Sequence, residues 1–385
     1  MRVLVAFDKF KEALTAREAC DTAVRSLREK HPDWRFDVCP LSDGGDGFEE
    51  VLSSAVSGDR MVRQVTGPRG TLVETGFTLV PKNKIAPAAI AKLQLTPGSA
   101  VDANVALIEM ATASGLALLP PTQRDPWQTT SRGTGQLMRA AAEAGAAAIV
   151  LGIGGSATHD LGLGALSALG LEFRDANGAS IRPPIPSAWE QINNIAGTLL
   201  TLPPIYVACD VTNPLLGPKG AAAVFAPQKG LHADEFTGLE IATERIAQML
   251  CAHFHQPLTL PGMPGTGAAG GMAFGLMCAL QAQLLPGFGF VADWLALDAK
   301  IAAADLVISG EGRFDATSLG GKGPGAVLSR AIAAKKRVFL FAGQIASPTA
   351  HDLLSLHEIT PTDVPLDRAL HDAAHFLKQA IQRAL

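Results

Sequence analysis

Acidic side chains recur in this sequence at the points where apolar, strand-like segments end. The acids in such positions are Asp8, Asp43, Asp210, Glu311 and Asp315. Ligands of open parallel sheets bind outside the carboxyl ends of the strands, so acids placed there can hold a metal ion or accept a proton. A single acid in such a turn is more often a helix cap or an Asx turn, and it is the recurrence that favours a functional site.

A glycine-rich segment, residues 151–160 with the sequence LGIGGSATHD, ends another apolar run. Consecutive glycines let backbone N–H groups turn toward a ligand, and here Gly154 and Gly155 are followed by the hydroxyls of Ser156 and Thr158. A turn of this kind between a strand and a helix suits an oxyanion such as phosphate. A plain tight turn is the alternative interpretation, so the predicted phosphate cradle needs support from other segments.

Two common nucleotide-binding patterns are absent from the sequence. The dinucleotide pattern Gly-x-Gly-x-x-Gly, started at Gly152, fails at Ala157. A Walker loop around Lys322 fails because Ala316 and Gly323 stand where Gly and Ser or Thr are required. Protein-kinase signatures are absent as well. Any nucleotide site therefore belongs to another architecture.

The loop of residues 310–315, with the sequence GEGRFD, combines both kinds of charge that phosphoryl transfer uses. Carboxylates such as Glu311 and Asp315 can bind a divalent cation. Arg313, together with Lys322 further along, can offset negative charge on a phosphoryl group. A solvated polar loop is the alternative interpretation.

Two polar residues, Ser131 and Arg132, stand directly before Gly133-x-Gly135. They can cap the helix that follows, or they can bind an anion at its N-terminus. Asp160 is expected to open the helix that follows the glycine-rich segment.

Composition excludes several classes of protein. The 385 residues are 48% hydrophobic and 18% charged, which is typical of a globular chain long enough for two domains. The formal net charge of −4 predicts no nucleic-acid partner. The apolar run before Asp8 is too short for a signal peptide or a membrane span, and the five cysteines include no Cys-x-x-Cys pair. We therefore expect a cytoplasmic protein without a membrane partner.

The two ends of the sequence predict parts of one parallel sheet. Strands are expected over residues 3–7, 36–41, 304–310 and 337–343. Helices are expected after Thr15 and over residues 44–54, 322–334 and 366–384.

The middle of the sequence predicts a second α/β domain. Residues 62–80 are typical of a hairpin around a turn at 67–70. Residues 82–104 are polar, and we expect them to form a mobile connection. Further strands are expected over 105–110, 147–152 and 205–209, and helices over 134–144, 236–251 and 266–283. The predicted organisation is a sheet domain of residues 1–66 and 285–385, an inserted α/β domain of residues 67–284, and a ligand cleft between them.

Eight segments together resemble one family, the bacterial-type class I glycerate kinases. They are AFDKFKEALTA (6–16), LSDGGDGFE (41–49), IEMATASGL (108–116), TTSRGTGQLM (129–138), GIGGSATHD (152–160), CDVTNPLLGPKGAAAVFAPQKG (209–230), PGTGAAGGMAFGL (264–276) and DLVISGEGRFDATSLGGKGPGAV (305–327). The segments follow the family order and cover almost the whole chain. Each one is loose alone, but the set is highly specific.

The resemblance implies ATP-dependent phosphorylation of D-glycerate with Mg²⁺, usually at the 2-hydroxyl to give 2-phosphoglycerate and ADP. It also implies a flavodoxin-like domain built from both termini and an inserted domain with a restriction-endonuclease-like topology. The expected partners are small molecules, D-glycerate and ATP, and the chain is expected to be a monomer or a homodimer. Phosphorylation of the 3-hydroxyl or of another short hydroxy acid stays open, as does a non-catalytic metabolite sensor.

Within this interpretation each candidate residue has a predicted role. The cradle for ATP is Gly154, Gly155, Ser156 and Thr158, with Lys229 or Lys322 near the phosphates. Mg²⁺ is expected on two of Asp43, Asp210 and Glu311. Asp210 or Asp315 is the expected base, and the expected substrate-binding residues are Arg313, Ser131, Arg132 and Lys11.

The sequence departs from the usual family residues at several positions, which are Lys9, Glu12, His159, Ala226 and the pair Thr317-Ser318. A carboxylate at position 12, near an anion site, is expected to weaken substrate affinity or to shift the preferred acceptor.

Overall fold

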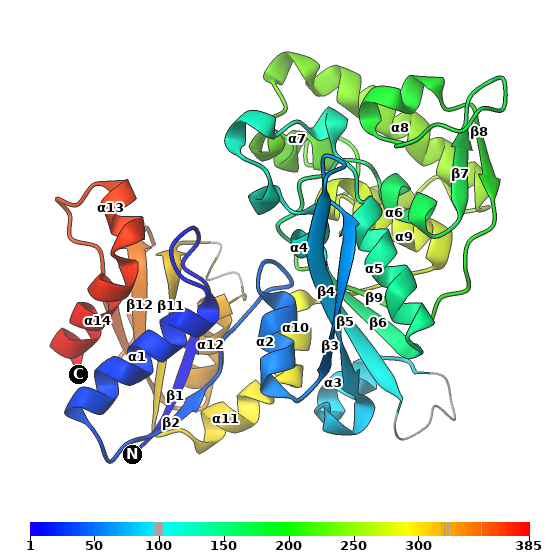
Figure 1. The fold of residues 1–385 in the computed structure, drawn as a ribbon. Helices are drawn as coiled ribbons and strands as arrows, with labels where there is room; N and C mark the ends of the chain where they lie inside the picture. Colours follow the sequence, from blue (N-terminus) through cyan, green and yellow to red (C-terminus); the bar gives the residue numbers. More distant parts are fainter. Residues whose placement is uncertain (96–102, 317, 319–320, 322, 348) are drawn as a thin grey trace. The chain divides into compact units, whose positions relative to one another are not determined.

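The computed structural model describes residues 1–95, 103–316, 318, 321, 323–347 and 349–385. The chain divides into two compact units (Figure 1). One, here called the terminal unit, comprises Met1–Asp43, Glu50–Ala55 and Phe288–Leu385. The other, here called the inserted unit, comprises Gly44–Glu49 and Val56–Gly287.

The terminal unit is built on a parallel sheet with the order β13-β12-β11-β1-β2. Its strands are β1 (Arg2–Phe7), β2 (Arg35–Val38), β11 (Leu306–Phe314), β12 (Arg337–Ile345) and β13 (Leu354–Glu358). Numbered within the unit, the strands follow the order 2-1-3-4-5, which is the flavodoxin-like arrangement. Blue β1 and golden β11 lie side by side in Figure 1, so both termini build one sheet as the sequence predicts.

Helices cover this sheet, and α1 packs against α14 over a core that includes Val5, Phe7 and Leu377. The helices are α1 (Ala16–Lys30), α10 (Gly287–Trp294), α11 (Leu297–Ala303), α12 (Gly323–Ala333), α13 (Leu366–His371) and α14 (Ala373–Ala384). Helix α1 begins with a capping box, since Thr15 Oγ1 accepts a hydrogen bond from Glu18 N at 3.1 Å and the Glu18 carboxylate accepts one from Thr15 N at 2.8 Å.

The inserted unit contains a mixed sheet with the order β10-β9-β6-β5-β4-β3. Its strands are β3 (Asp59–Thr66), β4 (Leu72–Pro81), β5 (Asn104–Glu109), β6 (Ala146–Gly152), β9 (Ile205–Ala208) and β10 (Gln283–Leu285). Strands β3, β4 and β5 pair antiparallel, and β5, β6, β9 and β10 pair parallel. A separate hairpin pairs β7 (Leu171–Arg174) with β8 (Asn194–Gly197).

The predicted hairpin of residues 62–80 is confirmed as β3 and β4, and its turn is closed by a hydrogen bond from Gly67 N to Thr71 O at 2.6 Å. Because β3 pairs with β4 of the inserted sheet, the longer segment of this unit, Val56–Gly287, includes the residues before 67 that the sequence prediction placed in the other domain. On the far side it ends at Gly287, close to the expected boundary at residue 285.

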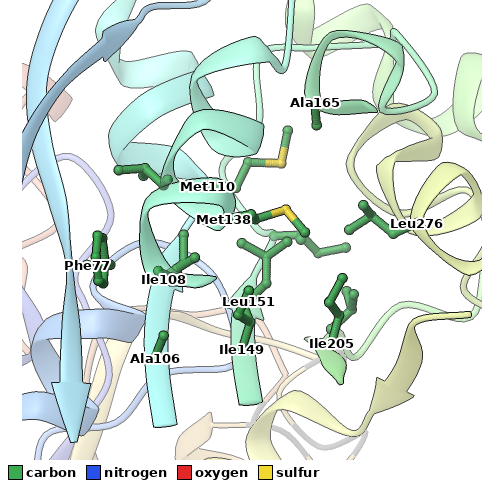
Figure 2. Packing of buried hydrophobic residues seen from close by; sticks show 14 of the residues in the cluster. Phe77, Ala106, Ile108, Met110, Met138, Ile149, Leu151, Ala165, Ile205 and Leu276 are labelled. Atoms are coloured by element: carbon green, nitrogen blue, oxygen red, sulfur yellow. The ribbon is translucent and has the colours of Figure 1, made fainter. Parts of the chain in front are cut away.

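The helices of this unit pack on the sheet around a buried core, in which Met138 and Leu276 face Ile108 and Leu151 (Figure 2). They are α3 (Pro87–Lys92), α4 (Ala111–Ser114), α5 (Arg132–Glu143), α6 (Leu163–Ala168), α7 (Ala221–Phe225), α8 (Phe236–His253) and α9 (Ala268–Leu280). Helix α2 (Phe48–Ala55) begins in the inserted unit and continues in the terminal unit.

Three helix boundaries differ from the sequence prediction. Helix α2 starts at Phe48 and not at residue 44, because the glycines at 44 and 47 adopt positive φ. Helix α6 starts at Leu163 after left-handed Gly162, so Asp160 does not open it. The predicted helix over 366–384 is interrupted at Asp372, where φ and ψ of −99° and 15° separate α13 from α14.

Among the described residues, no helix has the length and apolar character needed to cross a bilayer. All five cysteines are free thiols.

Candidate functional site

Three loops of the inserted unit meet at the carboxyl ends of β5, β6 and β9. The segment Gly44–Glu49 lies across these ends, because Gly154 N donates to Gly44 O at 3.0 Å. A Cβ atom on Gly44 would lie 2.7 Å from Ala208 O, and one on Gly152 would lie 2.6 Å from the Phe48 ring. The segment is therefore in direct contact with the loops that follow β6 and β9, and Asp210 belongs to the second of these loops.

The glycines of the predicted cradle are required by this packing. A Cβ on Gly154 would lie 2.4 Å from Gly45 Cα. Gly155 has a φ of +71°, and a Cβ there would lie 2.0 Å from Asp46 Oδ1. Within the described part of the chain, the amides of Gly155 and Ser156 donate to no protein atom. The loop thus combines close backbone packing with two N–H donors that an oxyanion can use.

Lys229 lies beneath this loop and ties its two sides together. Its Nζ donates to Ser156 Oγ at 2.9 Å and to Thr158 O at 2.6 Å, and the residue is only 2% exposed. Burial lowers the pKa of Lys229 to about 7, which the nearby charge of Asp160 partly opposes. Thr158 is buried too, and its Oγ1 has no hydrogen-bond partner among the described residues.

Asp160 joins the starts of two helices. Its Oδ2 accepts hydrogen bonds from Ser131 N at 2.7 Å, Ser131 Oγ at 2.8 Å and Gly164 N at 3.1 Å. Burial raises the pKa of Asp160, and these hydrogen bonds oppose the rise. Ser131 Oγ also accepts from Ala165 N at 3.0 Å, so the Ser131 hydroxyl is occupied by protein contacts. The guanidinium of Arg132, next in the chain, donates to Ser167 Oγ at 3.0 Å.

His159 is buried and neutral. Thr243 Oγ1 donates to Leu239 O at 2.7 Å, so it accepts from His159 Nε2 at 3.0 Å, and Nε2 carries the ring proton. Burial, with a smaller effect of the Lys229 charge, lowers the pKa of His159 to about 3. The histidine at this position therefore acts as a neutral hydrogen-bond donor within the inserted unit.

The terminal unit holds a second group of acids at the carboxyl ends of β1 and β11. Asp8 N donates to Gly310 O at 2.9 Å, which brings the chain after β1 next to β11. Burial, together with the charges of Asp8, Asp315 and Asp43, raises the pKa of Glu311 to about 7, while a hydrogen bond with Ser318 opposes the rise. Burial likewise raises the pKa of Asp8 to about 6, against the effect of Lys9. The four carboxylates are thus close enough to interact.

Basic side chains accompany these acids. Lys9 Nζ lies 3.8 Å from Asp43 Oδ1, and Arg313 Nε lies 3.6 Å from Asp315 Oδ2. The Arg313 side chain is 64% exposed, so its guanidinium can reach a solute anion. Lys11 is exposed, and its backbone lies beside Gly312, where a Cβ would lie 3.2 Å from Lys11 N.

The donor chemistry of this acidic group fits Mg²⁺. Glu311 Oε1 is buried without a hydrogen-bond partner in the described residues, and a divalent cation would stabilise the ionised form of a carboxylate whose pKa is raised. Nowhere in the described ranges do three metal-ligating side chains converge. Mg²⁺ commonly uses one or two carboxylates together with water and phosphate oxygens, so Asp43 and Glu311 suffice as protein ligands.

The predicted site residues therefore fall into two sets. Those of the inserted unit are Gly154, Gly155, Ser156, Thr158, Lys229, Ser131, Arg132 and Asp210, and those of the terminal unit are Asp43, Glu311, Arg313, Asp315 and Lys11. Lys322 lies outside the described residues. The sequence predicts no role for Asp46 or Glu109. In the structure the Asp46 carboxylate lies against Gly155 of the cradle, and Glu109 accepts a hydrogen bond from Gly47 N in the adjacent segment. A signal for Glu109 existed, since an acid ends the apolar run of residues 104–109.

Comparisons with known proteins agree with one another. The sequence profile described as the glycerate kinase family matches residues 3–385. The chain is 37% identical to a glycerate kinase of Bacillus subtilis (strain 168), over 98% of this chain and 95% of that protein. It is also 37% identical to a glycerate 2-kinase of Escherichia coli (strain K12), over 97% of this chain and 94% of that protein. A crystal structure assigned to a glycerate kinase 2 of Salmonella typhimurium LT2 matches with a TM-score of 0.77 and 38% identity, covering 100% of this chain and 97% of that chain.

Proposed function

The chain belongs to the glycerate kinase family, and from this premise we propose that it transfers the terminal phosphoryl group of ATP to the 2-hydroxyl of D-glycerate. The products are 2-phosphoglycerate and ADP. The choice of the 2-hydroxyl is supported by the relative named glycerate 2-kinase, which aligns with 97% of the chain. The proposal that this loop binds ATP depends on one observation: in the loop after β6, the amides of Gly155 and Ser156 have no acceptor among the described residues.

In this proposal the Gly155 and Ser156 amides bind phosphate oxygens of ATP. Lys229 supports the loop from beneath through Ser156 Oγ and Thr158 O and adds positive charge to its surroundings. The transition state of phosphoryl transfer is loose, so alignment and charge neutralisation account for most of the lowering of the barrier. A loop held rigidly by packing, as this one is, provides such alignment.

Asp43 and Glu311 would hold Mg²⁺ in the terminal unit. When bound, the ion neutralises charge on the phosphate oxygens. The raised pKa of Glu311 is consistent with a carboxylate whose ionised form needs a nearby cation.

Asp315 or Asp210 accepts the proton of the glycerate hydroxyl. Arg313 is the better supported anchor for the glycerate carboxylate, because its guanidinium is exposed and only loosely paired with Asp315. Arg132 is the alternative anchor, although one of its guanidinium nitrogens already donates to Ser167. We place the reaction in the cytoplasm, in keeping with the five free thiols.

The proposal is tested by incubating the protein with MgATP and D-glycerate and identifying the product by phosphorus NMR. The 2-phosphoglycerate resonance is the expected result. A 3-phosphoglycerate resonance would replace the 2-hydroxyl by the 3-hydroxyl as acceptor. No phosphoglycerate would contradict the proposed function, and a panel of other short hydroxy acids with ADP detection would then identify the acceptor.

A further inference from the structure

Glu109 is a buried carboxylate for which the sequence predicts no role. It is the last residue of β5 and is 6% exposed. Its Oε1 accepts a hydrogen bond from Gly47 N at 3.0 Å, and its Oε2 accepts one from Glu49 N at 3.1 Å. Both oxygens are thus used to hold backbone amides at the start of α2.

The segment held by Glu109 bears directly on the cradle. Gly44, at the beginning of this segment, accepts the Gly154 N–H at 3.0 Å, and Gly45 lies against Gly154 closely enough to exclude a Cβ. The Asp46 carboxylate occupies the space in which a Gly155 side chain would lie. A continuous series of contacts therefore leads from Glu109 through residues 44–47 to the two amides proposed to bind ATP.

We propose that Glu109 is a positioning residue for phosphoryl transfer, which orients the Gly155 and Ser156 amides by fixing the segment Gly44–Glu49 against the ends of β5 and β6. This inference rests on the proposed function, because it assumes that these amides bind ATP. It adds a residue that touches neither substrate but on which the alignment of the phosphates depends.

The two amides of Gly47 and Glu49 need two acceptor atoms, and the Glu109 carboxylate provides both. A glutamine here would accept only one of the two N–H groups and would turn its own NH₂ group toward the other donor. The carboxylate persists although burial, together with the charges of Asp46 and Glu49, raises its pKa to about 7 against the lowering effect of the hydrogen bonds from the Gly47 and Glu49 amides. A well-packed apolar side chain would avoid that cost but would leave two amides without an acceptor.

Asp175 offers a control within the same unit. It follows β7, outside the segment Gly44–Glu49 and outside the loop after β6, and its Oδ1 accepts hydrogen bonds from Asn177 N at 2.9 Å and Ala179 N at 2.8 Å. Asp175→Asn therefore perturbs another carboxylate that holds two backbone amides without touching the segment held by Glu109.

The experiment compares wild type, Glu109→Gln and Asp175→Asn by steady-state kinetics with ATP and D-glycerate varied separately. For Glu109→Gln we expect kcat/KM for ATP to fall at least tenfold while KM for D-glycerate changes less than twofold. For Asp175→Asn we expect kcat/KM for ATP within threefold of wild type, even where its melting temperature falls as far as that of Glu109→Gln. Hydrogen exchange of peptides covering residues 44–50 is expected to accelerate only in Glu109→Gln.

Kinetics of Glu109→Gln that match wild type would overturn the inference, as would equal losses in the two variants. If Glu109→Gln does not fold, Glu109→Asp is measured in its place with the same criteria, since it keeps both oxygens but withdraws them by one methylene group. Wild type without glycerate-dependent ADP release would contradict the proposed function, and with it the positioning role of Glu109 in phosphoryl transfer. The exchange comparison would then still report whether Glu109 holds the segment.

Discussion

Replacing Gly154 by alanine tests whether the cradle is positioned by backbone packing. The added Cβ would lie 2.4 Å from Gly45 Cα and 3.1 Å from Gly45 N. Carbon atoms in contact settle at about 3.5–4.0 Å, so one of the two loops must move by about 1 Å. Gly45 cannot yield easily, because it is backbone in a segment held by Glu109 at one end and by Gly154 at the other.

The size of the effect follows from this displacement. Overpacking of a well-packed site costs about 1–3 kcal/mol, and each kcal/mol lowers the melting temperature of a unit of this size by about 2–4 °C. A misplacement of about 1 Å in a positioning element lowers the rate by about 100-fold. We therefore expect Gly154→Ala to fold with a modestly lower melting temperature and to lose about 100-fold in kcat/KM for ATP.

The assay is a coupled measurement of ADP release together with thermal denaturation followed by circular dichroism. Gly262→Ala is the control, because Gly262 is exposed and an added Cβ would meet no atom within 4 Å. This control should stay within about 1 kcal/mol of wild type in stability and keep full activity. A Gly154→Ala variant as active and as stable as Gly262→Ala would refute the reasoning from packing.

Three further predictions follow from the two units. Asp43→Asn, which removes a proposed metal ligand, is expected to lower kcat more than Asp315→Asn, which removes a candidate base; equal effects in steady-state assays would contradict this order. Chelation of Mg²⁺ with EDTA is expected to abolish ADP release reversibly, with recovery on adding Mg²⁺, and undiminished turnover would remove the metal from the mechanism. The pKa of Lys229, lowered by burial to about 7 from an unfolded value of 10.5, predicts that the unfolded state binds more protons between these values. The free energy of unfolding of wild type relative to Lys229→Met should therefore rise with pH from 7 to 9 by as much as about 1.4 kcal/mol per pH unit. Urea titrations in which this difference stays constant from pH 7 to 9 would contradict the prediction.

Local patterns in the sequence predicted most of the fold. Thr15 is predicted to cap the first helix, and the structure confirms this cap and adds Glu18 as the second member of a capping box. The parallel sheet of the terminal unit was predicted because its strands are continuous apolar runs, as buried parallel strands are. Such features depend only on neighbouring residues, so one sequence suffices to identify them.

Features that depend on distant partners were harder to predict. The predicted domain boundary at residue 67 divides the hairpin that the sequence predicts over 62–80, because the onward pairing of β4 with β5, which places both strands in the inserted sheet, is not a local feature. The glycines of the cradle were interpreted as room for a ligand, and the structure shows that Gly154 and Gly155 also give room to Gly45 and Asp46, about 110 positions earlier in the sequence. Sequence spacing carries no information on what lies opposite a glycine.

Residues of the candidate site differ in the same way. The acids at strand ends are predicted because topology places such ends together, and in the structure Asp43 raises the pKa of Asp8 while Asp8 and Asp43 both raise that of Glu311. Glu109 received no role because an acid at the end of an apolar strand has the same local appearance whether it faces solvent or accepts two amides. Its role is visible only once the position of α2 is known.

The discontinuous terminal unit has a consequence for synthesis of the chain. About 300 residues separate β1 from β11, its neighbour in the sheet. At about 5–20 residues per second, a ribosome needs about 15–60 s to supply that partner. During this interval one edge of β1 lacks its native neighbour, and the last strand of the inserted sheet, β10, is completed before β11 is made. The inserted unit can therefore fold first, while the apolar edge of β1 stays exposed until β11 is available to pair with it.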